Sequence, residues 1–169
     1  MSRQGALEDE SGFTLIEVIV TIVLMGIVFA IASSYWFGLV EDRRVNSATN
    51  QMVSELHFAH TSATNRLQTW QVDLRPADEA PDVRNVSYRV APCEAPCVAL
   101  PPPSRSLEEG TEFPPGMEGV RVVFQPDGGA EVNGAGNLEI RSAAADGDPC
   151  HEIEINEATS RVRVTTNVC

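Results

Sequence analysis

Glu17 is the residue whose type and position say most about the chemistry of this chain. It is a lone carboxylate in the first turn of a long apolar run that begins at Phe13. An ionisable side chain near the start of a membrane-length helix is energetically costly, so it indicates a function and requires a partner. Elsewhere the sequence has no nucleophile elbow, phosphate-binding loop or dinucleotide fingerprint. We therefore expect a non-enzymatic protein with no catalytic residue and no cofactor.

The residues that could bind a metal have unconvincing spacing. His57 and His60 are three residues apart on an expected helix, and this spacing is more typical of surface or packing histidines than of metal ligands. Cys93 and Cys97 form a C-x-x-x-C pair, but no second pair at zinc spacing accompanies them. We expect no metal site.

The four cysteines, all beyond the apolar run, are candidates for disulfides. An even number of cysteines in a translocated domain favours disulfides over free thiols. Three pairings are possible, and proximity along the chain favours Cys93 with Cys97 and Cys150 with Cys169. The second pair flanks an expected hairpin over 151–165, whose antiparallel strands would bring its two ends together.

Charge argues against nucleic acid as the main partner. The full chain of 169 residues has a formal net charge of −12, which repels phosphates unless basic groups cluster locally. Arg161 and Arg163 are such a local pair, because strand alternation places both on one face as a small candidate phosphate-contact patch. The alternative is a solvated strand face paired with the glutamates Glu152, Glu154 or Glu157.

Residues 13–40 are expected to form a membrane anchor. The roughly 20 residues from Phe13 to Ala32 span about 30 Å as a helix, the thickness of a bilayer core. The stretch is too long for the apolar part of a secretory signal peptide, and no A-x-A cleavage site follows it. A plain signal-anchor helix is the stronger alternative, but it leaves Glu17 unexplained. One basic residue, Arg3, precedes the anchor and two, Arg43 and Arg44, follow it closely. By itself, the positive-inside rule would place the N-terminus outside the cytoplasm.

The remainder predicts an α+β domain. The helix is expected to continue to about residue 67, because apolar side chains recur at helical spacing (Val45, Met52, Leu56, Ala59, Ala63 and Leu67). Alternating patterns then predict strands over 70–74, 83–90, 119–125, 138–142, 151–156 and 161–165. The apolar stripe of the helix should pack on an antiparallel sheet, and the length suits one such domain plus one anchor.

The order Gly12-Phe13-Thr14-Leu15-Ile16-Glu17 resembles the type IV prepilin signature, shared by type IV pilins and the pseudopilins of type II secretion. The resemblance implies a leader at 1–12, cut between Gly12 and Phe13 by a prepilin peptidase, and N-methylation of Phe13. It makes Glu17 the assembly carboxylate, which pairs with the α-amino group of a neighbouring subunit and neutralises two costly charges. Residues 13–40 would be the transmembrane and assembly helix, and 41–169 a periplasmic domain.

Later segments are similar to the GspH/FimT family: Leu56–Arg66, Val72–Leu74, Val123–Gly128 and Ser160–Val164. Ser160 stands where that family has glycine, and the proline-rich Cys93–Cys97 segment is not part of its pattern. The resemblance implies a pilin-like fold and a minor pseudopilin of type II secretion in the bacterial inner membrane. Its partners would be other pilins or pseudopilins in a filament and the inner-membrane assembly platform. The alternative is a FimT-like minor type IV pilin for pilus assembly or DNA uptake. The sequence identifies neither the cargo nor the position in the filament.

Overall fold

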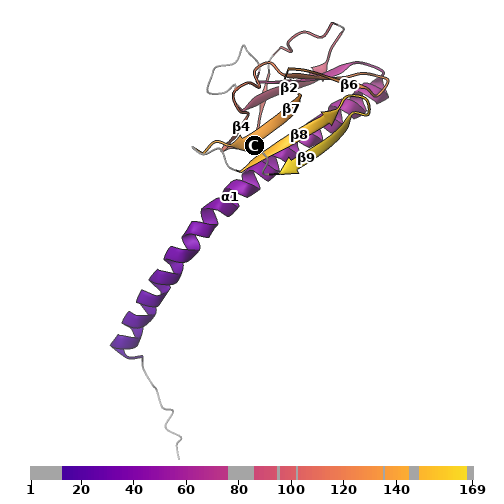
Figure 1. Ribbon diagram of the computed structural model, residues 1–169. Helices are drawn as coiled ribbons and strands as arrows, with labels where there is room; N and C mark the ends of the chain where they lie inside the picture. The colour runs from indigo at the N-terminus through magenta and orange to yellow at the C-terminus, as the bar shows by residue number, and fades with distance from the viewer. Residues whose placement is uncertain are drawn as a thin grey trace, which may run out of the picture. The chain divides into compact units, whose positions relative to one another are not determined.

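The computed structural model describes residues 13–75, 86–94, 96–101, 103–134, 136–144 and 149–166 (Figure 1). Within these ranges, one helix, α1 (Leu15–Arg66), is followed by nine strands. The chain divides into two compact units, Met1–Leu39 and Val40–Cys169. The expected α+β fold, a long N-terminal helix followed by antiparallel strands that pack on it, is therefore confirmed.

The helix ends one residue earlier than the apolar spacing predicted. Leu67 was expected on the buried stripe, but its side chain is 77% exposed and its φ is 52°. The amide of Gln68 donates to the carbonyl of Ala63 at 3.2 Å, the bond that closes a Schellman motif. Leu67 thus occupies the left-handed position that terminates the helix, which turns its side chain away from the core.

The strands form two antiparallel sheets, where the sequence predicted one. The five-stranded sheet has the order β3-β2-β1-β5-β6 and the four-stranded sheet the order β4-β7-β8-β9. The bounds in the first sheet are Arg105–Ser106 (β3), Ser87–Pro92 (β2), Trp70–Leu74 (β1), Arg121–Phe124 (β5) and Ala130–Asn133 (β6). Those in the second are Thr111–Glu112 (β4), Asn137–Ser142 (β7), Cys150–Asn156 (β8) and Arg161–Thr166 (β9).

The sequence analysis did not predict β3, β4 or β6, because their residues show no strand pattern. β3 and β4 have two residues each, too few to show alternation, and β6 has a single β-branched residue, Val132. The predicted strand over 83–90 is confirmed from Ser87, and its first residues lie outside the described part of the chain.

The core lies between the second half of α1 and the sheets. The buried helix stripe contains Val45, Ala48, Met52, Leu56, Ala59 and Ala63, each with no exposed surface. From Ala48 to Ala63 it packs in one cluster with residues of both sheets, among them Val72, Phe124 and Ile153. Shortening a buried side chain such as Leu56 to alanine would cost about 2–5 kcal/mol of folding free energy.

Ser160, at the position where glycine was expected, adopts a positive φ of 51°. Residues with a Cβ are strained in this conformation, which explains why glycine suits the position. Its hydroxyl donates to the carbonyl of Gly128 at 2.5 Å, so Ser160 also ties the β8–β9 turn to the β5–β6 turn.

Candidate functional site

The first turn of α1 holds Glu17 in a defined local arrangement. The Glu17 amide donates to the Thr14 hydroxyl at 3.3 Å and to the Thr14 carbonyl at 3.1 Å. Thr14 therefore caps the helix, and Thr14-Leu15-Ile16-Glu17 has the S/T-x-x-E spacing of a capping box. The sequence analysis missed this arrangement, although the spacing is visible in the sequence. It gives Glu17 a second potential role, as a helix cap.

The helix beyond Glu17 is long and apolar enough to cross a membrane. Its large apolar side chains are exposed in this single chain, as Phe29 illustrates with an exposed fraction of 75%. Gly26 has no heavy atom within 4 Å of where a Cβ would lie, so no described contact within the chain requires its small size. The described apolar side chains of this segment, from Leu15 to Ile31, are therefore largely exposed within the chain.

The Cys93–Cys97 disulfide was predicted and is present, with the two Cα atoms 5.4 Å apart. Cys150 is also disulfide-bonded, and its expected partner, Cys169, lies outside the described residues. No cysteine in the described part of the chain is free. Free-thiol chemistry is therefore absent from these ranges.

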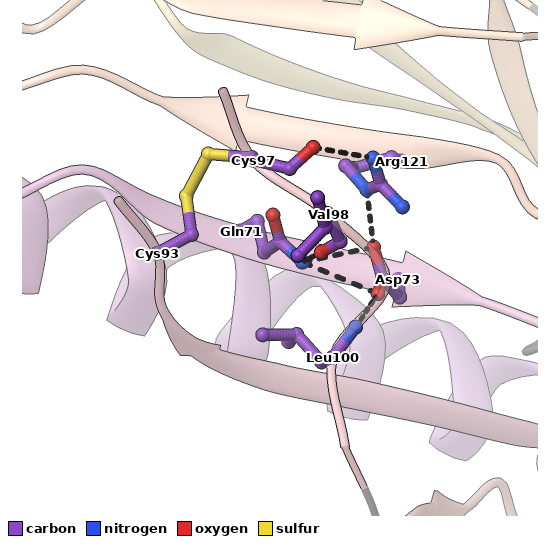
Figure 2. The surroundings of a disulfide bond; sticks show 7 residues. All are labelled: Gln71, Asp73, Cys93, Cys97, Val98, Leu100 and Arg121. Carbon is purple, nitrogen blue, oxygen red and sulfur yellow. Dashed lines mark hydrogen bonds and ion pairs between the residues drawn. A yellow bond between two sulfur atoms is a disulfide. The ribbon is translucent and has the colours of Figure 1, made fainter. Parts of the chain in front are cut away.

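A buried carboxylate lies beside the first disulfide (Figure 2). Asp73, on β1, is only 4% exposed and accepts hydrogen bonds from Arg121 Nε at 2.7 Å and from the Leu100 amide at 2.7 Å. Gln71 Nε2 also donates to both carboxylate oxygens, at 3.2 and 3.3 Å. Such a charge is tolerated in the interior because it is paired and hydrogen-bonded.

The same side chains fix the segment Cys97–Leu100 on the sheet. Arg121 Nη1 donates to the Cys97 carbonyl at 2.9 Å, and Gln71 Nε2 to the Val98 carbonyl at 2.6 Å. Because the backbone is held inward, the Val98 side chain is left 71% exposed. The sequence analysis did not foresee this clamp, in which Gln71, Asp73 and Arg121 hold the backbone of Cys97–Leu100. Gln71 and Asp73 lie in a strand that the structure buries along its whole length, which the alternating pattern of residues 70–74 did not indicate.

The two arginines proposed for phosphate contact lie on β9 and are exposed. Arg163 pairs across the ladder with Glu154, and Arg161 with Asn156. With Thr159, these four residues line a shallow hollow of about 370 Å³. The structure therefore brings the arginines together but places a carboxylate beside them.

Burial shifts the pKa of two described residues of the globular unit. It raises the pKa of Tyr88, whose hydroxyl accepts from Gln51 Nε2 at 2.9 Å. It lowers the pKa of His151, opposed by the charge of Asp42. His151 Nδ1 lies 3.1 Å from the hydroxyl of Thr49, which donates to the Val45 carbonyl, so Nδ1 carries the proton of that contact.

His57 and His60 both lie on α1. The described ranges contain no group of three or more histidine, cysteine, aspartate or glutamate side chains placed to hold a metal ion. The His60 ring instead packs against Phe124, with ring centroids 5.7 Å apart.

Residues 9–33 match the family model described as the prokaryotic N-terminal methylation motif. No curated protein and no solved structure matches the chain. The motif match supports a type IV prepilin-like protein, and it suggests a structural rather than a catalytic role. It covers only the start of the chain.

Proposed function

We propose that this type IV prepilin-like chain is a minor pseudopilin of a type II secretion system, similar to GspH. The observation that carries the proposal is the methylation motif over residues 9–33, which coincides with a membrane-length helix holding a single carboxylate in its first turn. The chain would be a structural component of the periplasmic pseudopilus for protein export. It would be anchored once in the bacterial inner membrane, with residues 41–169 in the periplasm.

In this proposal, residues 1–12 are a leader removed by a prepilin peptidase between Gly12 and Phe13. The new α-amino group of Phe13 is N-methylated and keeps a positive charge. At an inner-membrane assembly platform, Glu17 pairs with this group on a neighbouring pilin or pseudopilin. Two charges that are expensive at membrane depth are thereby neutralised together, which favours one register between subunits.

Mass spectrometry of the protein from its native host tests the processing step. We expect a chain that begins at Phe13 and carries the added mass of one methyl group. An intact leader, or cleavage at another bond, would contradict the proposal.

The capping arrangement at Thr14 provides a sharper test of Glu17. Glu17→Gln keeps the glutamine or glutamate that a capping box requires but removes the charge, whereas Thr14→Ala removes the cap and keeps the charge. If the intersubunit ion pair is the essential contact, Glu17→Gln should abolish incorporation into filaments. Thr14→Ala should assemble with a modest loss of stability. The reverse pattern would assign Glu17 to capping. The measurement is crosslinking of the variants into filaments, with leader processing as the control.

The alternative is a FimT-like minor type IV pilin for pilus assembly or DNA uptake, which is favoured by the exposed pair Arg161 and Arg163. Deleting the gene separates the two candidates. Loss of exported proteins with intact surface pili supports the pseudopilin. Loss of pili or of transformation with normal export supports the alternative.

A further inference from the structure

β9 is the long open edge of the four-stranded sheet (Figure 1). It pairs with β8 on one side, and no described strand pairs with its other side. The opposite edge strand, β4, has only two residues. In the other sheet, β3 also has two residues, while the amides of Ala130 and Val132 on β6 donate to Glu157. Among the edge strands of the described ranges, β9 is therefore the longest, and all six of its residues lack a described strand on the outer side.

The two faces of β9 differ in chemistry. Arg161 and Arg163 are two residues apart and lie on the same face. Residues 158–169 contain no acidic residue, although the net charge of the whole chain is −12. On the other face, Val162 packs against the core, whereas Val164 remains 39% exposed. A strand added at the outer edge would thus meet guanidinium groups on one face and an aliphatic side chain on the other.

The inner neighbour of β9 shows which sequence complements these faces. In β8, Glu154 lies opposite Arg163 and Ile153 opposite Val164. β8 alternates glutamate and isoleucine from Glu152 to Ile155. Because side chains of adjacent strands share a face, a segment with the same alternation would present carboxylates and aliphatic groups correctly on the outer side.

We propose that the outer edge of β9 binds an extended protein segment of alternating acidic and aliphatic residues as an added strand. Backbone hydrogen bonds would supply affinity, and the arginine face would supply selectivity. A second copy of β9 fits poorly, since pairing would bring guanidinium groups of both strands together. The arginines thus disfavour a basic strand and favour an acidic strand over a neutral one. The partner proposed here is a protein segment, and it does not depend on which filament system the chain serves.

The experiment uses the full chain in detergent micelles and amide hydrogen exchange. The probe is a blocked synthetic peptide that repeats the sequence of Glu152–Ile155 twice, and the matched probe has glutamine in place of every glutamate. We expect the acidic peptide to slow exchange within Arg161–Thr166. Two cross-strand charge pairs of about 0.2–1 kcal/mol each correspond to roughly 2- to 30-fold tighter binding than that of the glutamine peptide.

Two charge-reversal variants complete the test. Arg161→Glu with Arg163→Glu should remove the preference for the acidic peptide, whereas Arg43→Glu with Arg44→Glu, which changes the net charge equally on α1, should retain it. Unchanged exchange in β9, or equal binding of both peptides, would overturn the proposal. Protection of the same amides by duplex DNA but not by the peptide would also overturn it, because the arginines would then be a phosphate site.

Discussion

Replacing Asp73 by asparagine should destabilise the globular unit more than any exposed ion-pair variant. Three donors converge on the two carboxylate oxygens: Arg121 Nε, the Leu100 amide and Gln71 Nε2. Asparagine offers one acceptor oxygen, and its amide group would face these donors. Breaking a buried ion pair by removing one partner costs about 3–5 kcal/mol. Because the Arg121 side chain is 21% exposed and water reaches it, we expect about 3 kcal/mol.

Urea unfolding of the full chain in a mild detergent measures this loss. Trp70 is a suitable fluorescent reporter, since it is 6% exposed and its ring contacts Phe58 with centroids 5.5 Å apart. Trp36, which is 67% exposed, should be replaced by phenylalanine in every variant to remove its background signal. With a urea dependence of about 2 kcal/mol per molar, the midpoint should fall by about 1.5 M.

The matched control is Glu112→Gln, because Glu112 pairs with Arg141 at 2.8 Å and both side chains are partly exposed. An ion pair of this kind contributes at most about 1 kcal/mol. A second readout is the Leu100 amide, whose exchange should accelerate in Asp73→Asn and not in the control. An Asp73→Asn midpoint equal to that of Glu112→Gln would refute the reasoning that this carboxylate holds the Cys97–Leu100 segment in place.

Three further outcomes are expected in the same assay. Leu67→Gly should stabilise the unit by about 1 kcal/mol, because glycine relieves the left-handed strain and the lost leucine is exposed; a lower midpoint would contradict this. Burial lowers the pKa of His151 below its ordinary 6.5, so the unfolded chain binds the proton at a higher pH than the folded chain does. The free energy of unfolding should therefore keep the full contribution of neutral His151 above about pH 6.5 and decline as the pH falls. His151→Gln should flatten that decline. Replacing Cys93 and Cys97 together by serine opens a five-residue loop and should cost about 2 kcal/mol, with an unchanged midpoint as the contrary result.

Part of the candidate site could be predicted because its signals are local. The place of Glu17 behind Gly12 and Phe13 needs no tertiary information, and the motif match falls on the same residues. The Cys93–Cys97 pair was predictable from proximity along the chain. The role of Glu17 stays a prediction, because its partner would lie on another subunit.

Other features could not be predicted because distant residues create them. Asp73 is separated by 27 residues from Leu100 and by 48 from Arg121, so nothing near it in the sequence marks it as a buried ion-pair centre. The division into two sheets depends on which strands pair, β1 with β5 in one sheet and β7 with β8 in the other, and residue alternation does not specify strand partners. Leu67 satisfied the helical spacing, but the chain had to leave the helix there to enter β1.

The sequence by itself determined the α+β class and the long helix, because periodic burial of side chains is written directly in residue order. It also determined the lone carboxylate at the helix start. Only the tertiary structure decided which polar groups meet around Asp73, and which strand register places Arg163 opposite Glu154. Hydrogen bonds and ion pairs act over a few ångströms in space, and separation along the chain does not encode that distance.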